Sequence, residues 1–521
     1  MLREYQSISK RKIRVPANVG DIYSVFSVEL QQYVVCQVTH IQPPRTPRGK
    51  PLAAVLQLDW LGDALPDAAA ASRMQPLRYS YYFVRNRLDH GYVTANVPPD
   101  HVFIANLPPL VEDEVHTYKF GWDTGASLAR QRSWEQIDPA RRKQFRAASG
   151  GNKVIVGGHV FKQDATRIND SILDAVKDLS ELDLLPCLMT IETSKGTPEL
   201  MAYIRQHPFI NELHWQSSTV TEIDISAMHL QRFVLQPDGV TRVRLNSGLQ
   251  LFSLTTTPSP HLQVEQAEQG RDLSLQCGEE MPVLQGLDRL GALSLTGVRE
   301  LDLAPVVERF PHLRELRLWG KPGMARNLRS IAQLSQLQML TTFDVFGFGA
   351  DEFPSPEQLP NLASLWMTSL PADVAKAVKT AYKKAAAQGL DLSISKPRKP
   401  EWLAENLHNP FRDWDGREQI SAAQAKKAAL AYKNLLAATR AIDAGMPAAE
   451  AAAALDAMVT AYTEDFNKME RSGIIETVER EEIYAVLADV LVQLETELGG
   501  QGPALVQQER LYELFDQLRD F

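Results

Sequence analysis

The stretch VTEIDISAMHLQRFVLQPDGVTRVRL, residues 220–245, repeats one apolar pattern three times at intervals of ten residues. Each copy has an apolar residue, two residues of any kind, a second apolar residue, one residue of any kind and a third apolar residue. The copies are Val220/Ile223/Ile225, Leu230/Phe233/Leu235 and Val240/Val243/Leu245. Because alternate side chains of a strand share one face, each copy predicts a short strand whose apolar side chains point inward.

The same pattern continues on both sides of this stretch. Every second copy, centred near residues 214, 234, 253, 274 and 294, predicts one strand of a repeating coil of about twenty residues. The copies between them, near 224, 244 and 263, predict a second strand on the convex side of each coil. Twenty residues are too few for a strand, two turns and a full helix, so convex helices are expected only after about residue 300. The ten-residue interval is therefore half a coil of a stacked solenoid.

After residue 300 the sequence resembles the leucine-rich repeat family. The segments FPHLRELRLWG (310–320), LQMLTTFDVFG (337–347) and LPNLASLWMTS (359–369) fit its L-x-x-L-x-L core. We assign the inward triplets to Leu313/Leu316/Leu318, Leu340/Phe343/Val345 and Leu362/Leu365/Met367. The segments 325–334 and 371–389 have helical periodicity, and a last strand is expected at Leu390, Leu392 and Ile394. The resemblance covers roughly residues 185–396 and implies a solenoid there.

The residues between the inward positions point outward onto the concave sheet. In the early strands they are small and polar, whereas the late strands add aromatic and charged side chains, a composition typical of protein-binding hot spots. The predicted partner-binding residues are Arg317, Trp319, Asp344, Phe346 and Trp366. A second interpretation is that these aromatic side chains cap the end of the solenoid beneath the C-terminal region.

Residues 1–150 have a different sequence pattern from the repeats. Strand-like runs occur at Ile22–Val28, Tyr33–Val38, Leu52–Leu58, Tyr79–Val84 and Val102–Ile104. They predict a small β domain. The segments GDIYSVF, YVVCQV and YKFGW resemble an immunity-protein family found beside bacterial polymorphic toxins. That resemblance implies neutralisation of a toxin by binding. An ordinary β domain with a turn at Gly20-Asp21 is the alternative.

The C-terminal part is predicted to be helical and acidic. Residues 397–416 read as a connector with aromatic anchors, and 417–521 as a four-helix domain. Ser421 and Gln424 form a predicted capping box, and Pro447 suits the first turn of the next helix. Residues 464–521 hold 14 Asp and Glu against 5 Lys and Arg, which gives this segment a net charge of −9. The whole chain has the same net charge, so its acidity is concentrated in this segment. We interpret Glu476, Glu479, Glu481 and Glu482 as a solvated face that could also dock onto a basic partner.

Composition narrows the function classes. A chain of 521 residues that is 44% apolar and 23% charged is an ordinary globular protein, and its net charge of −9 argues against a general nucleic-acid binder. The short basic runs Lys10–Lys12 and Arg141–Lys143 are interpreted as solvated surface. Three widely spaced cysteines favour the reducing cytoplasm, and no apolar run is long enough to cross a membrane.

No catalytic motif has a suitable context. The pair of glycines in VIVGGHVF (154–161) predicts a turn, and the neighbours Asp89-His90 and Asp100-His101 are not expected to form dyads. The fold class is α/β and multi-domain: a β domain (1–150), a leucine-rich repeat solenoid with an N-terminal cap (151–396), a connector (397–416) and a helical domain (417–521). We expect a cytoplasmic, non-catalytic protein without cofactor or metal that binds another protein, with a toxin of basic surface as the candidate partner. The alternatives are an enzyme with a composite site where the β domain meets the solenoid, and a general scaffold.

Overall fold

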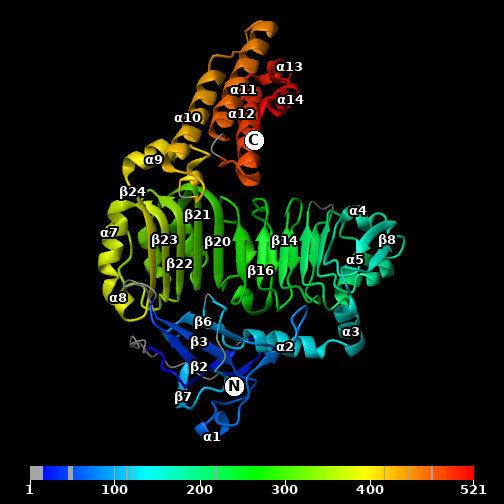
Figure 1. The fold of residues 1–521 in the computed structure, drawn as a ribbon, viewed down its shortest axis with the longest axis vertical. Coiled ribbons are helices and arrows are strands. Elements are labelled where there is room, and N and C mark those ends of the chain that lie inside the picture. The colour runs from blue at the N-terminus through cyan, green and yellow to red at the C-terminus, as the bar shows by residue number, and fades with distance from the viewer. Residues whose placement is uncertain are drawn as a thin grey trace. The chain divides into compact units, whose positions relative to one another are not determined.

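The computed structural model describes residues 16–27, 29–44, 51–98, 100–112, 115–119, 121–216, 220–415, 417–443, 445–470 and 473–521. The chain forms two compact units, Met1–Pro397 and Arg398–Phe521, and each is described by itself. Figure 1 shows the elements in chain order from blue to red. Val28, Phe120 of YKFGW and the run Lys10–Lys12, which the predictions include, lie outside the described part.

The N-terminal part of the first unit is an antiparallel five-stranded sheet. Its strands are β1 (Asp21–Ser27), β2 (Gln32–Gln42), β3 (Leu52–Gln57), β6 (His90–Thr94) and β7 (Val102–Asn106), in the order β6-β3-β2-β1-β7. Four of them lie on predicted runs. Strand β6 was not predicted, and the run Tyr79–Val84 contributes only the end of β4 (Arg78–Tyr79), which pairs with β5 (Arg87–Leu88).

The Gly20-Asp21 turn has a clear physical cause. Gly20 has φ +89°, and a Cβ there would lie 2.6 Å from the carbonyl oxygen of Leu107, so only glycine fits. The buried Asp21 carboxylate accepts hydrogen bonds from the Tyr23 hydroxyl at 2.9 Å and from Asn106 Nδ2 at 2.8 Å. The predicted turn is confirmed, and its aspartate ties β1 to the end of β7.

A helical segment follows the sheet and leads to the solenoid. It contains α2 (Ala126–Gln136) and α3 (Pro139–Ala147); the short α1 (Ala68–Ala71) lies earlier in the chain. Trp134 of α2 and Phe145 of α3 pack with Tyr81, Cys187 and Phe209 in one buried cluster. The region where the β domain meets the solenoid is thus filled by an aromatic core.

The solenoid is built on one parallel sheet of eleven strands, which Figure 1 shows side by side in chain order. The strands are β10 (Arg167–Ile168), β11 (Thr190–Thr193), β12 (Glu212–Trp215), β14 (Arg232–Leu235), β16 (Leu251–Leu254), β18 (Ser274–Cys277), β20 (Ala292–Asp302), β21 (Glu315–Arg326), β22 (Met339–Phe346), β23 (Ser364–Pro371) and β24 (Asp391–Arg398). Before β10 a hairpin of β8 (Lys153–Val156) and β9 (His159–Lys162) turns at Gly157 and Gly158, both with positive φ. The turn predicted for VIVGGHVF is confirmed.

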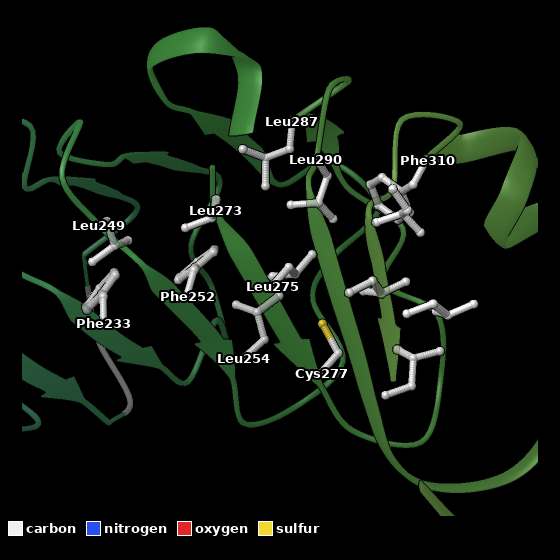
Figure 2. Packing of buried hydrophobic residues seen from close by; sticks show 14 of the residues in the cluster. Phe233, Leu249, Phe252, Leu254, Leu273, Leu275, Cys277, Leu287, Leu290 and Phe310 are labelled. Atoms are coloured by element: carbon white, nitrogen blue, oxygen red, sulfur yellow. The ribbon is translucent and has the colours of Figure 1, made fainter. Parts of the chain in front are cut away.

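The apolar triplets are buried in register, as the pattern predicts for the early coils. Phe233 of β14 pairs with Phe252 of β16, and their rings stack at 5.6 Å with an interplanar angle of 13°. Figure 2 shows these rings beside Leu254 and Leu275 in one continuous row of apolar side chains. Each coil therefore covers the apolar side of its neighbour.

The early coils carry a second, shorter parallel sheet, as predicted. Its strands are β13 (Glu222–Asp224), β15 (Arg242–Arg244), β17 (Gln263–Glu265) and β19 (Gln285–Gly286). The expectation that convex helices begin only after about residue 300 is wrong at the first full coil, where α5 (Pro198–Gln206) lies between β11 and β12. Thr197 Oγ1 accepts the N–H of Leu200 at 3.2 Å, so α5 has its own N-cap. The short elements α4 (Asp170–Leu173), η1 (Leu179–Leu184) and η2 (Ala267–Gly270) complete this half.

The late coils have helical segments opposite the long sheet. These are α6 (Leu303–Arg309), η3 (Leu328–Gln333), α7 (Ala372–Ala381) and α8 (Lys383–Ala387), of which η3, α7 and α8 lie on the segments predicted to be helical. The last strand, β24, contains the predicted positions 392 and 394. Its neighbour Leu390 is buried in the solenoid core.

The second unit is helical. Its elements are α9 (Pro400–Asn406), η4 (Arg412–Trp414), α10 (Ala422–Thr439), α11 (Ala448–Glu470), α12 (Thr477–Glu497), η5 (Gly499–Gln501), α13 (Gly502–Val506) and α14 (Gln508–Leu518). The Ser421–Gln424 capping box is present. Gln507 has φ +47° and separates α13 from α14 where one helix was predicted. Phe411 and Trp414 are buried against Phe466, so the predicted aromatic anchors belong to this unit's core. Among the described residues, no helix combines the length and apolar character needed to span a bilayer.

Candidate protein-binding surface

Three neighbouring strands, β21, β22 and β23, place aromatic and charged side chains on the outward face of the long sheet. Arg317, Thr341 and Trp366 are partners in the strand register and form one row across the three strands. Trp319, Phe343 and Thr368 form the next row, two residues further along each strand. All six side chains are half-buried, so part of each is accessible. We call these six residues the late-strand surface.

Polar contacts hold several of these side chains in place. Arg317 Nη2 lies 2.8 Å from Glu315 Oε2 on the same strand and 3.7 Å from Met339 Sδ on the next. Trp366 Nε1 donates to Asp391 Oδ2 at 2.9 Å, and the hydroxyls of Thr368 and Ser395 are 2.9 Å apart. Side chains that are already oriented lose less conformational freedom when a partner binds.

The early strands present a different outward row. His214, Val234, Ser253, Gln276 and Ser294 are partners in the register. His214 Nε2 lies 2.5 Å from Glu212 Oε1, which is also 3.5 Å from Arg232 Nη1. The small and polar side chains predicted for this half are therefore observed, and they offer little apolar area to a partner.

The predicted register of β22 is wrong, and the error moves two site residues. Leu340 pairs with Leu316, and Thr342 pairs with Leu318, so the inward places of this repeat belong to Leu337, Leu340 and Thr342. Leu340 and Val345 are buried in the solenoid core as predicted, whereas Phe343 was wrongly placed inward. Asp344 and Phe346 were expected to point outward, but only 2% and 1% of their surfaces are exposed. Asp344 also has φ +52°, so the strand departs from extended geometry there.

The other predicted site residues keep their place. Arg317 and Trp319 lie on β21 and Trp366 on β23, with β22 between the two strands, and all three are partly accessible on the outward face. The missing member is Phe343, which pairs with Trp319 and takes the outward place assigned to Phe346. Reading Leu337 as the first apolar residue of that repeat would have found it, because Leu337 and Leu340 are both buried.

The two acid–histidine neighbours behave differently. Asp89 pairs with Lys119, and His90 Nε2 instead lies 2.6 Å from Thr39 Oγ1, so these two separate as expected. Asp100 Oδ1 and His101 Nδ1 lie 2.8 Å apart, contrary to the expectation, because both precede β7 and are not on a strand. His101 Nε2 is also 2.9 Å from Thr124 Oγ1, and the imidazole packs edge-on against Trp122.

This Asp–His–Thr chain resembles a nucleophile relay in connectivity only. The His101 side chain is 6% exposed. Its two nitrogens are both occupied within the β domain, and Thr124 is also 3.6 Å from the buried Cys36. A nucleophile and its base need room for a reacting carbonyl beside them. The contacts are those of a structural hydrogen-bond chain, buried at His101 and exposed at Asp100, that joins the segment before β7 to the segment before α2.

The acidic face predicted on α12 is only partly solvated. Glu476 and Glu481 are exposed, but Glu479 is buried and forms an ion pair with Arg417. Arg417 Nη2 also lies 2.6 Å from Glu482 Oε1, and Glu482 Oε2 accepts from Trp414 Nε1 at 2.8 Å. Glu479 and Glu482 thus bind the segment before α10 to α12. The prediction of a solvated face is wrong for these two residues, which form structural ion pairs with Arg417.

The three cysteines are free and buried. Burial raises the pKa of the Cys36 and Cys277 thiols to about 12 and that of Cys187 to about 11. Thiols at neutral pH are poor nucleophiles and poor metal ligands. In the part of the chain that the structure describes, no three His, Cys, Asp or Glu side chains gather as a metal site.

Comparisons with known proteins add little to this description. No family model matches the chain, and no curated protein matches it. Among solved structures, the chain is similar to internalin C2 from Listeria monocytogenes str. 4b F2365 at 18% identity, over 45% of this chain and 93% of that one, with a TM-score of 0.20. The solenoid rests on the eleven strands of the long sheet and the apolar triplets buried between its coils.

Proposed function

We propose that the protein binds another protein through the late-strand surface. The observation that carries this proposal is the gathering of Trp319, Phe343 and Trp366, all partly accessible, on three adjacent strands beside Arg317. Tryptophan and arginine are enriched among residues that dominate binding energy, and a protein-sized partner can cover several strands at once. The outward positions of the early strands include Arg232 but no tryptophan or phenylalanine.

The test is a triple substitution of Trp319, Phe343 and Trp366 by alanine. The matched control replaces three half-buried residues of the early strands, Val234, Ser274 and Gln276, by alanine. We expect wild type and control to retain the same bound proteins in affinity capture, and the late-strand variant to lose them at an unchanged Tm. Equal retention by the two variants would exclude the late-strand surface as the binding site.

A toxin with a basic surface is the narrower proposal for the partner. It is supported by the resemblance of GDIYSVF and YVVCQV to immunity proteins and by the acidic segment 464–521. Opposite charges speed the encounter of two proteins, and salt screens this effect. We therefore expect the association rate to fall as salt rises, while the dissociation rate changes little. Co-expression with a candidate toxin, scored by growth, tests neutralisation separately from binding.

A further inference from the structure

Helix α3 carries a basic groove that the proposed protein-binding surface does not use. The groove has a volume of about 770 Å³ and is lined by four cationic side chains: Arg85, Arg142, Lys143 and Arg146. Three of them belong to α3, at positions that share one face of a helix, because residues three and four apart are neighbours. Phe145, on another face, anchors the helix in the aromatic cluster with Trp134 and Phe209.

The positive charge of the groove is only partly offset within the chain, by Glu135, which interacts electrostatically with Arg142. Glu135 is the acidic side chain lining it, and both its oxygens are taken: Oε1 accepts from Gln131 at 2.7 Å and Oε2 from Arg132 at 2.8 Å. Among the residues that the structure describes, none of the four cations has a carboxylate within ion-pair distance. Gathering like charges without counter-ions is unfavourable, so the groove favours an incoming anion.

The arginines are partly withdrawn from water, which strengthens this argument. Arg142 and Arg146 are half-buried, and Arg142 Nε is buried without a hydrogen-bond partner. Burial and the neighbouring charges of Arg85 and Arg142 lower the pKa of Arg146. A buried donor without an acceptor costs free energy, which an oxyanion in the groove would recover.

The groove is also held in shape before any ligand arrives. Arg146 Nη2 donates to the carbonyl oxygen of Ser80, and its guanidinium lies 5.2 Å from the centre of the Trp134 ring. Asn86, with φ +46°, donates its N–H to Ser80 Oγ at 2.8 Å and closes the turn that carries Arg85. These contacts fix the loop and the helix that face each other across the groove.

We propose that this groove binds a small molecule carrying a diphosphate-type polyanion. Guanidinium groups bind phosphate oxygens through paired N–H donors, and four clustered cations suit more than one phosphate charge. The groove is open to solvent, and its volume of about 770 Å³ exceeds what a single phosphate would fill. The site is distinct from the late-strand surface and needs no partner protein.

The experiment is isothermal titration of the full chain with sodium pyrophosphate, at an ionic strength held constant with sodium chloride. We expect saturable binding that weakens about tenfold or more in Arg142→Gln and in Lys143→Gln, because each loses a charge-assisted hydrogen bond. The matched control is Arg141→Gln, on the same helix but facing Gln206, whose carbonyl oxygen it contacts at 3.1 Å. Lys143 is exposed, so its substitution tests the groove without disturbing the core.

Three outcomes would overturn the proposal. One is the absence of saturable heat with pyrophosphate. Another is an equal affinity in Lys143→Gln and Arg141→Gln, which would mean diffuse attraction to a basic helix. The third is binding of a short single-stranded oligonucleotide but not of pyrophosphate, since the groove would then serve a nucleic-acid backbone. A Tm of Lys143→Gln equal to wild type shows that a loss of binding is not a loss of folding.

Discussion

The indole Nε1 of Trp366 donates a hydrogen bond to Asp391 Oδ2 at 2.9 Å, so a side chain of β23 is oriented by the adjacent strand β24. The hydrogen bond orients the side chain within the protein, whereas the indole ring offers apolar area to a partner. These two contributions can be separated by substitution.

Trp366→Phe should keep most of the partner binding, because the apolar area survives. Trp366→Ala should weaken binding by about tenfold or more, since truncated hot-spot tryptophans cost upwards of about 2 kcal/mol. Surface plasmon resonance with a captured partner measures both. If the alanine variant binds as tightly as the phenylalanine variant, the ring is not part of the contact.

Leu316→Asp should destabilise the first unit by several kcal/mol, because Leu316 is fully buried and an aspartate there would be an unpaired buried charge. The control is Ser294→Asp, at an outward position of the neighbouring strand β20. Its effect should stay within about 0.5 kcal/mol, as for most surface substitutions. Urea unfolding measures the difference, and two variants of equal stability would contradict the register.

Glu479→Ala should destabilise the second unit by about 1.5–3 kcal/mol, because Arg417 loses its buried partner and keeps only Glu482. Gln419 Nε2, which lies 3.1 Å from Glu479 Oε1, would lose its acceptor as well. The matched control is Glu481→Ala, two residues further along the same helix and exposed. Calorimetry of the full chain should show one transition lowered by the first substitution and unchanged by the second.

His207 should make the first unit less stable as the pH falls. Burial and the nearby charge of Arg141 lower the pKa of His207 to about 4, from 6.5 for an ordinary histidine. Between these values the unfolded chain binds the proton and the folded chain does not, so stability is lost from about pH 6.5 down to about pH 4, at no more than about 1.4 kcal/mol per pH unit. Nδ1 of His207 is buried without a hydrogen-bond partner, which agrees with a neutral ring.

In the variant His207→Gln, residue 207 binds no proton in either the folded or the unfolded chain. The slope of stability against pH should therefore become shallower in that window, while a constant offset from the changed packing is allowed. Urea midpoints at several pH values measure the slope. An identical slope in variant and wild type would show that another group carries the acid sensitivity.

The repeat itself was predictable because its apolar period has no other simple explanation. The strands β13, β15 and β17 lie on the predicted positions. The register of β22 could not be predicted. LQMLTTFDVF has apolar residues at 337, 340, 343 and 345, so the repeat can begin at either Leu337 or Leu340. The structure uses Thr342 where the repeat normally has leucine, and a shifted register exchanges the two faces of a strand.

The remaining surprises have long-range causes. The pairing of Glu479 with Arg417 joins residues 62 positions apart, which no local pattern reveals. The groove on α3 likewise needs Arg85 beside Arg142, and in the sequence the basic run alone indicates only solvated charge. Helix α5 has a threonine N-cap and a proline in its first turn, and both indicate a helix. The prediction missed it because it treats a coil of twenty residues as too short for a helix.

The exchange of strands for helices along the solenoid has a consequence for its curvature. Neighbouring strands lie about 4.8 Å apart, so coils with β13, β15 or β17 opposite the long sheet have equal spacing on both sides and stack straight. Packed helices need about 8–10 Å, so α6 and the neighbouring η3, which pack on each other, spread the far side of the coils that carry β20 and β21. We therefore expect the long sheet to curve inward around β21, beside β22 and β23. A partner with a convex surface could contact Trp319, Phe343 and Trp366 together there. The uncurved early part of the sheet would fit only a partner with a flat surface.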